Sequence, residues 1–246
     1  MGQSEAERDV PYLSTEQMIE VDRAMMEDFK IELIQMMENA GRNLAHLARV
    51  RFLGGDPRGK RVVVLAGTGG NGGGALVAAR RLHSWGADVR VYITRPAPDF
   101  TPIPAHQLDI LQRMKVPIGF AADLAQQDDC EVILDGVIGY SLKGAPRGSA
   151  ADLIRWANRQ DAPILALDAP SGVDTTTGIA YEPTIRATAT MTLALPKQGF
   201  LAPSIAAQLG ELYVADISVP PSLYAGPGLG LSVGPLFAQE DIVRLR

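Results

Sequence analysis

The feature that most constrains the fold is an apolar run that leads directly into a cluster of glycines. Residues 61–66 read Arg-Val-Val-Val-Leu-Ala, a β-branched run typical of a strand covered on both faces. Residues 67–74 read Gly-Thr-Gly-Gly-Asn-Gly-Gly-Gly, and an apolar helical pattern continues from Ala75 to Gly86. A strand, a glycine turn and a helix in this order predict the first unit of a parallel α/β sheet.

The same alternation continues along the chain. Further strands are predicted at Val89–Ile93, Val132–Leu134, Ile164–Leu167, Ala189–Leu195 and Leu212–Ile217, with helices near Ala105–Met114 and Ala151–Asn158. Two helices precede this alternation, one opened by a capping box of Ser14 and Gln17, the other running from about Ile31 to Arg51. The pattern predicts an α/β fold, a Rossmann-like three-layer sandwich with a mostly parallel central sheet and helices on both faces.

The chain is predicted to form one domain over residues 1–246, with residues 1–10 as a disordered tail. The proline-rich stretch Pro96–Pro104 is interpreted as a loop, and Pro220–Pro235 as a long irregular connection. Gly41 stands inside the second helix at a cost of about 1 kcal/mol relative to Ala. A close contact with another helix would explain it, although the sequence shows no such contact.

Composition excludes several classes of protein. The 246 residues carry a net charge of −5, which gives no basic footprint for nucleic acid. The single cysteine, Cys130, cannot form an internal disulfide, and no apolar run approaches the roughly 18 residues of a membrane helix. We therefore expect a soluble cytoplasmic protein that binds neither nucleic acid nor membranes.

Polar residues stand directly after three of the predicted buried strands. Asp135 comes after one strand and Asp168 after another, while the glycine cluster comes after the first. Either acid alone could simply cap a turn, but ligands of open parallel sheets bind beyond these strand ends. Two carboxylates that face one glycine loop therefore favour an acid/base or cation site.

The type of ligand is narrowed by two further observations. The glycine cluster matches a dinucleotide fingerprint, yet the second strand ends at Ile93-Thr94-Arg95 without the acid that holds the ribose hydroxyls in dehydrogenases. A conventional hydride-transfer enzyme is therefore disfavoured. Asn71, Asp135 and Ser171 would offer only oxygen ligands, which suit an alkali or other hard cation better than zinc.

These motifs resemble the NAD(P)H-hydrate epimerase family, also called the YjeF N-terminal domain. The resemblance covers most of the chain and lies in Leu13–Met18 (L-S-T-E-Q-M), Met37–Gly41 (M-E-N-A-G), Gly67–Gly74, Asp135–Gly139, Asp168–Asp174 (D-A-P-S-G-V-D) and Leu195–Leu201 (L-P-K-Q-G-F-L). The combination of M-E-N-A-G with D-x-P-S-G-x-D is the most specific part.

The resemblance implies an isomerase that interconverts the R and S forms of NADHX and NADPHX, hydrated nicotinamide cofactors, during cofactor repair. A separate dehydratase domain, which acts on the S form, is not expected here. By motif position, Asn71, Asp135 and Ser171 would bind one potassium ion per subunit, and Asp168 would be the catalytic acid/base group. Substrate-binding residues by the same transfer are Gly70, Asn71, Gly72, Gly73, Gly74, Gly139, Tyr140, Ser141, Leu142, Lys143, Gly144, Ala145 and Asp168. A homodimer is also implied.

The glycine loop departs from the family pattern G-x-G-N-N-G-G-D-G. Gly70 replaces an Asn, Gly74 replaces the Asp, and Ala75 replaces the last Gly, so two polar side chains are missing. Tyr140 stands where the family has a small residue, and its ring could narrow the pocket. Two alternatives therefore remain open: a non-catalytic nucleotide-binding or dimerising scaffold, and an enzyme of this fold that acts on another nucleotide-like substrate.

Overall fold

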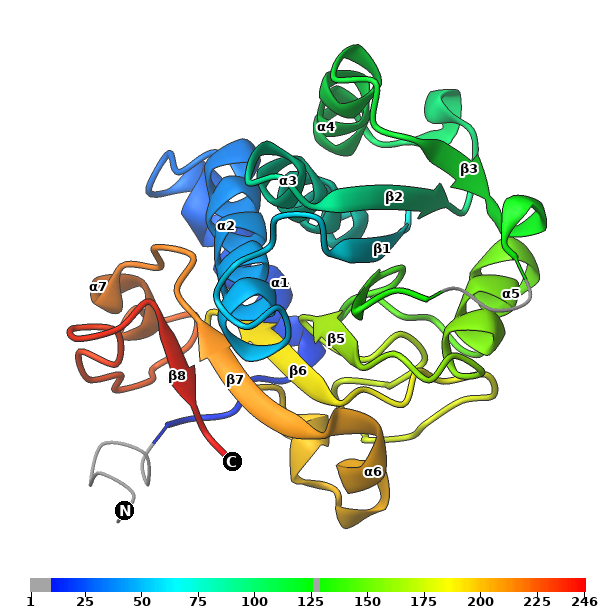
Figure 1. The fold of residues 1–246 in the computed structure, drawn as a ribbon. Helices are drawn as coiled ribbons and strands as arrows, with labels where there is room; N and C mark the ends of the chain where they lie inside the picture. The colour runs from blue at the N-terminus through cyan, green and yellow to red at the C-terminus, as the bar shows by residue number, and fades with distance from the viewer. Residues whose placement is uncertain (1–9, 126–128) are drawn as a thin grey trace.

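The computed structural model describes residues 10–125 and 129–246 (Figure 1). Of the tail expected at residues 1–10, residues 1–9 lie outside the described part, and Val10 packs against a core cluster built around the first helix. The longer helices are α1 (Thr15–Glu27), α2 (Leu33–Arg51), α3 (Gly70–Ser84), α4 (Pro102–Arg113) and α5 (Gly148–Ala157), with short helices α6 (Ala206–Leu209) and α7 (Pro221–Tyr224). Ser14 and Gln17 form the predicted capping box of α1.

One sheet of eight strands runs through the molecule in the order β3-β2-β1-β4-β5-β6-β7-β8. Its strands are β1 (Arg61–Ala66), β2 (Asp88–Ile93), β3 (Ile118–Phe120), β4 (Val132–Gly136), β5 (Ile164–Leu167), β6 (Ala189–Leu193), β7 (Glu211–Ala215) and β8 (Ile242–Arg244). All neighbours from β3 to β7 are parallel, and only β8 is antiparallel to its neighbour. The strand order reverses direction between β1 and β4, which makes their carboxyl ends the expected ligand site.

The strand β1 shows how the sheet is covered on both faces. Val62 and Val64 belong to a core cluster with residues of α2, α3 and α4, whereas Val63 and Leu65 belong to a second cluster with residues of α5. Figure 1 shows the corresponding arrangement, with α2, α3 and α4 on one side of the sheet and α5 on the other. The predicted three-layer α/β sandwich is confirmed.

Several predicted boundaries are wrong. The helix expected from Ala75 begins at Gly70, so most of the glycine cluster is helical rather than loop. The proline-rich stretch is helical from Pro102 onward, because proline is well suited to the first turn of a helix. The strand predicted to reach Leu195 ends at Leu193, because Ala194 adopts a left-handed φ of 64°.

Gly41 has the close helix contact that its position suggested. A Cβ there would lie 2.4 Å from Cβ of Val77 and 2.5 Å from the carbonyl oxygen of Gly74, both on α3. A Cβ at Gly73 would in turn lie 2.5 Å from Sδ of Met37 on α2. Glycines on both helices therefore let α2 and α3 approach more closely than side chains would permit.

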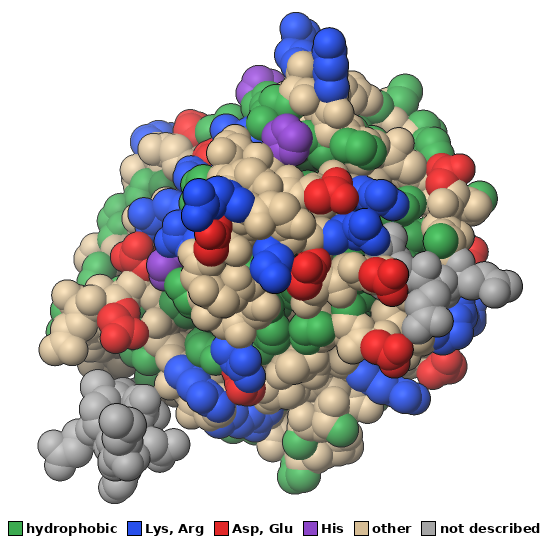
Figure 2. All heavy atoms as spheres, viewed as in Figure 1, with side chains coloured by type: hydrophobic (Ala, Val, Ile, Leu, Met, Phe, Trp, Pro, Cys, Tyr) green, Lys and Arg blue, Asp and Glu red, His purple; other side chains and the backbone are tan. Residues whose placement is uncertain are grey.

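The surface shows no segregation of charge on the face viewed in Figure 2. Basic and acidic side chains lie next to one another over most of that face. Within the described ranges, 10–125 and 129–246, no helix is long and apolar enough to span a lipid bilayer. The prediction that residues 1–246 form one domain stays a prediction.

Candidate active site

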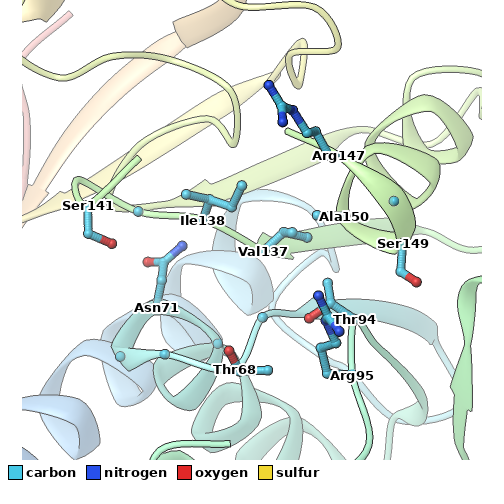
Figure 3. Close-up of a pocket in the computed structure, with 16 residues that line it drawn as sticks. Thr68, Asn71, Thr94, Arg95, Val137, Ile138, Ser141, Arg147, Ser149 and Ala150 are labelled. Atoms are coloured by element: carbon cyan, nitrogen blue, oxygen red, sulfur yellow. The ribbon is translucent and has the colours of Figure 1, made fainter. Parts of the chain in front are cut away.

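A cavity of about 770 Å³, which we call the nucleotide cavity, opens where β1 and β4 diverge. Its walls are the turn after β1, the segment after β4, the end of β2 and the first turn of α5 (Figure 3). The lining residues are Gly67, Thr68, Gly69, Gly70, Asn71, Gly72, Thr94, Arg95, Val137, Ile138, Gly139, Ser141, Arg147, Gly148, Ser149 and Ala150. The position of this cavity at the switch point agrees with the rule for open parallel sheets.

The nucleotide cavity is suited to an anionic ligand. The amino ends of α3 and α5, at Gly70 and Gly148, both border it and carry free backbone N–H groups. Arg95 and Arg147 line it as well, and within the described residues neither takes part in an ion pair. In the view of Figure 3, both arginines lie to the right of Asn71, Arg147 above Val137 and Arg95 below it.

Asp135, at the end of β4, is completely buried and is held by Ser171 and Val137. Its Oδ1 accepts hydrogen bonds from Ser171 Oγ at 2.6 Å and from the Val137 N–H at 3.2 Å, and its Oδ2 accepts one from the Ser171 N–H at 2.8 Å. Burial raises the pKa of Asp135 to about 6, although these hydrogen bonds oppose the rise. No cation among the described residues pairs with this carboxylate.

Asn71 and Ser171 converge on the segment that comes after Asp135. Ser171 Oγ accepts a hydrogen bond from the Ile138 N–H at 2.8 Å. A Cβ at Gly139 would lie 3.1 Å from Oδ1 of Asn71 and 3.2 Å from Oδ2 of Asp168. The absence of a side chain at Gly139 therefore lets the Asn71 amide and the Asp168 carboxylate both lie close to this segment. Within the described chain the buried Nδ2 of Asn71 has no hydrogen-bond partner.

Asp168, directly after β5, is held in a strained conformation by several partners. Its φ is 64°, a left-handed value that is uncommon outside glycine and that persists only where the surroundings enforce it. Its Oδ1 lies 2.8 Å from Nζ of Lys197, whose side chain is fully buried, and its Oδ2 accepts a hydrogen bond from the Tyr140 N–H at 3.1 Å. Lys197 also donates to Thr192 Oγ1 and to the carbonyls of Leu193 and Leu195.

A second, smaller cavity of about 150 Å³, which we call the inner cavity, adjoins the nucleotide cavity and shares Gly70, Asn71, Gly139 and Ser141 with it. Asp168 faces the inner cavity. Most of the wall is apolar and comes from α1, α2 and the ends of β5, β6 and β7: Met18, Leu33, Met36, Met37, Ala40, Leu167, Leu193 and Ile217. Asp22 and Tyr140 complete it.

The predicted site residues fall into three groups. Gly70, Asn71, Gly72, Gly139, Tyr140, Ser141 and Asp168 line one or both cavities. A second group lines neither cavity: Gly73 and Gly74 are buried inside α3, and Leu142, Lys143, Gly144 and Ala145 lie on the loop between the lining residues Ser141 and Arg147. Asp135 and Ser171 lie beneath the segment 137–139, hydrogen-bonded to each other. The structure thus brings the two strand-end acids and the glycine turn to one site.

Sequence analysis did not identify Lys197 or Asp22 as site residues. Lys197 lies in the L-P-K-Q-G segment that carried part of the family resemblance, but no role was assigned to it. Asp22 lies on α1 four residues after Met18 and next to Val21, on the apolar face of the helix. A carboxylate on a buried face is a signal that could have been noticed, because such groups need a partner.

Comparison with known proteins places this geometry in a family. The sequence matches the family described as YjeF-related protein N-terminus over residues 33–199. The chain belongs to this family. The matched range includes the glycine turn, Asp135, Asp168 and Lys197, so all the strand-end groups of the site lie within the YjeF-related part of the sequence.

Several relatives of this YjeF-related chain are named as enzymes that act on NAD(P)H-hydrate. It is 41% identical to the NAD(P)H-hydrate epimerase of Dehalogenimonas lykanthroporepellens, with 90% of this chain and 87% of that protein covered. It is 33% identical to the NAD(P)H-hydrate epimerase of Rhodopirellula baltica, with 86% of each covered. It is 34% identical to the bifunctional NAD(P)H-hydrate repair enzyme Nnr of Moorella thermoacetica, of which it spans 41%.

A solved structure shares the fold. The crystal structure of yeast ynu0 (YNL200c) superposes with a TM-score of 0.79 and covers 96% of this chain and 100% of the yeast chain. The sequence identity is 24%, so this likeness concerns the fold alone.

Proposed function

We propose that the protein is an NAD(P)H-hydrate epimerase that interconverts the R and S forms of NADHX and NADPHX. The observation that carries the proposal is the position of Asp168. This strained, ion-paired carboxylate faces the inner cavity where that cavity joins a polar cavity suited to a dinucleotide. The relatives named as NAD(P)H-hydrate epimerases, matched over most of both chains, support the same activity.

Each cavity would bind a different part of the substrate. The helix amino ends and arginines of the nucleotide cavity would bind the diphosphate and the adenosine part, whereas the apolar inner cavity would take the hydrated nicotinamide ring. Epimerisation of a hydrated ring carbon requires movement of the hydroxyl proton. Asp168, which forms an ion pair with Lys197, is the group that we assign to accept that proton.

The experiment is an epimerisation assay with the purified protein. R-NADHX or R-NADPHX is supplied in potassium buffer, and formation of the S form is monitored with a separate S-specific dehydratase. Conversion above the spontaneous rate is expected. A folded protein that binds NAD-like ligands without converting them would instead favour the non-catalytic scaffold, or an enzyme with another nucleotide-like substrate.

Arg95 and Arg147 give a prediction about substrate binding. Replacing both with Ala is expected to raise KM roughly tenfold, about 1.4 kcal/mol, with little change in kcat, because both cations border the nucleotide cavity and not the inner one. Initial rates at low and high salt check this, since screening should reduce the difference. Arg159→Ala, an exposed arginine outside both cavities, is the matched control; an equal KM in all variants would contradict the prediction.

Potassium is proposed as the ion bound by Asn71, Asp135 and Ser171. Three observations support a fit: the donors are oxygens, the fully buried Asp135 has no cationic partner among the described residues, and the end of the Asn71 amide is unpaired. Rotation of that amide presents its oxygen in place of the nitrogen. A bound monovalent cation would supply the missing positive charge and hold the segment after β4 in place.

Potassium should therefore stabilise the folded protein. The midpoint of thermal unfolding is expected to be higher in KCl than in choline chloride of equal ionic strength, by about 2–4 °C for each kcal/mol of linkage. Ser171→Ala, which removes one ligand oxygen, should reduce this difference, whereas Ser84→Ala on the exposed end of α3 should preserve it. Identical midpoints in both salts would contradict potassium binding.

The homodimer and the cytoplasmic location are proposed from the family resemblance alone. Sedimentation of the purified protein over a range of concentrations measures the first, and fractionation of cells that express the chain measures the second.

A further inference from the structure

Two carboxylates face the inner cavity. Asp168 comes from the end of β5, and Asp22 comes from α1, far away in the sequence. Tyr140 joins them: its hydroxyl donates a hydrogen bond to Asp22 Oδ2 at 2.5 Å, and its backbone N–H donates one to Asp168 Oδ2 at 3.1 Å. A single residue therefore forms hydrogen bonds with both acids.

The surroundings of the two carboxylates differ. Oδ1 of Asp168 lies 2.8 Å from Nζ of Lys197, and the two side chains form an ion pair. Asp22 has Tyr140 as its hydrogen-bond partner, and no lysine or arginine forms an ion pair with it in the described part of the chain. Burial raises the pKa of Asp22, and the hydrogen bond from the Tyr140 hydroxyl opposes that rise. The negative charge of Asp168 raises this pKa further, by more than the positive charge of Lys197 lowers it. A pair of acids with such different environments is typical of a division between base and acid.

We infer that Asp22 is a second catalytic group, the proton donor that complements Asp168 across the inner cavity. The inference rests on the proposed epimerase function and adds to it a residue from α1. Tyr140 is the positioning residue, because it holds the Asp22 carboxyl through its hydroxyl and Asp168 through its backbone.

The chemistry of the substrate needs both groups. The carbon that is epimerised carries a hydroxyl and is bonded to the ring nitrogen. Asp168 accepts the hydroxyl proton, the oxygen forms a carbonyl, and the carbon–nitrogen bond breaks with its electron pair moving to nitrogen, which takes the proton of Asp22. Rotation about the adjacent carbon–carbon bond presents the other face of the carbonyl. Nitrogen then attacks that face, returns its proton to Asp22, and the oxygen recovers the proton from Asp168.

These reaction steps need no other reactant, because the carbon–nitrogen bond that breaks forms again and both protons return to the groups that gave them. The apolar wall of the inner cavity supports it. Met18 and Met36 from the helices and Leu167 and Leu193 from the sheet offer water no hydrogen-bond partner beside the opened ring. A bound ring would remove further solvent from Asp22, and this favours its protonated form.

The test compares variants of two adjacent groups, Asp22 and Tyr140, with a control variant. Asp22→Asn removes the acid but keeps the size of the side chain, and kcat is expected to fall roughly 10²–10³-fold. Tyr140→Phe removes the hydroxyl that orients Asp22, and a smaller loss of about tenfold is expected, since the acid itself remains. Asp28→Asn, an exposed acid at the end of the same helix, is the control and should retain the activity of the unchanged protein.

The pH profile separates a catalytic role from a structural one. If Asp22 donates a proton, kcat falls as pH rises through its raised pKa, and Asp22→Asn loses this alkaline limb because Asn cannot titrate. Tyr140, Asp168 and Lys197 are the other titratable groups that face Asp22, so Tyr140→Phe should keep the limb and shift it.

Each outcome has a defined meaning. Two outcomes would overturn the inference and leave the epimerase function intact, provided that the unchanged protein is active. One is full activity of Asp22→Asn, and the other is an equal loss of activity in Asp22→Asn and Tyr140→Phe. No turnover by the unchanged protein would overturn the proposed function itself. Thermal unfolding midpoints and binding of NADP⁺ show whether a variant that loses activity is still folded.

Discussion

Replacing Asp168 with Asn is expected to reduce the rate of epimerisation by roughly 10²–10⁴-fold while leaving substrate binding within a few fold. The amide cannot accept a proton from the substrate hydroxyl, and general base catalysis is worth about this factor. Asn is the appropriate replacement because, among residues other than glycine, Asn and Asp adopt the left-handed conformation most readily, and φ here is 64°. The measurement is kcat and KM with R-NADHX, alongside the affinity for NADP⁺.

Asp152→Asn serves as the control for this experiment. Asp152 is an exposed acid of α5 that pairs with Arg155 and lines neither cavity, so its loss should not change the rate. Full activity of Asp168→Asn would remove the catalytic assignment. A loss confined to KM would show that Asp168 binds substrate without taking part in the proton transfer.

Replacing Lys197 with Met is expected to destabilise the protein by about 3–5 kcal/mol. The change leaves the Asp168 carboxylate buried without its cation, and breaking a buried ion pair from one side has this cost. It also leaves the hydroxyl of Thr192 and the carbonyls of Leu193 and Leu195 without the ammonium donor. Urea unfolding measures the free energy, and activity should fall together with stability because Asp168 loses its fixed position.

The double variant Asp168→Asn with Lys197→Met separates the contribution of the ion pair from that of the other contacts of each residue. Since neither buried charge remains, its destabilisation should be smaller than the sum of the two single losses. Lys60→Met is the control. Lys60 is only partly buried and its Nζ lies 3.9 Å from Oε1 of Glu131, and an ion pair of this kind near the surface contributes about 0–1 kcal/mol. Additive losses in the double variant would indicate that Lys197 stabilises the fold through its carbonyl contacts alone.

The sequence predicted the parts of the site that depend directly on strand positions. Asp135 and Asp168 each stand just after a buried apolar run, and parallel strands bring such positions to one edge of a sheet. The three-layer architecture was predicted from the same runs. Short edge strands were not predicted: β3 and β8 have three residues each, too few for a pattern of burial to be recognised.

The partners of the acids could not be predicted, for two physical reasons. Lys197 and Asp22 reach Asp168 and Tyr140 from segments that are distant in the chain, and only the tertiary packing brings them together. The left-handed backbone of Asp168, which directs its carboxylate toward the cavities, is also set by surrounding contacts and not by local sequence preference. Tyr140, expected to bind substrate and to narrow or reshape the pocket, lines the inner cavity, and its hydroxyl also links α1 to the loop after β4.

The glycine contacts between α2 and α3 affect the position of the N–H groups that border the nucleotide cavity. Some of the backbone N–H groups that border the cavity belong to the first turn of α3, and that helix packs directly against α2 at Gly41 and Gly73. A glycine has no side chain that could change its rotamer when the neighbouring helix shifts. The packing of α2 against α3 therefore limits where the N–H groups of α3 can lie. A helix that does not touch the ligand would in this way influence the distance between those N–H groups and the phosphate oxygens.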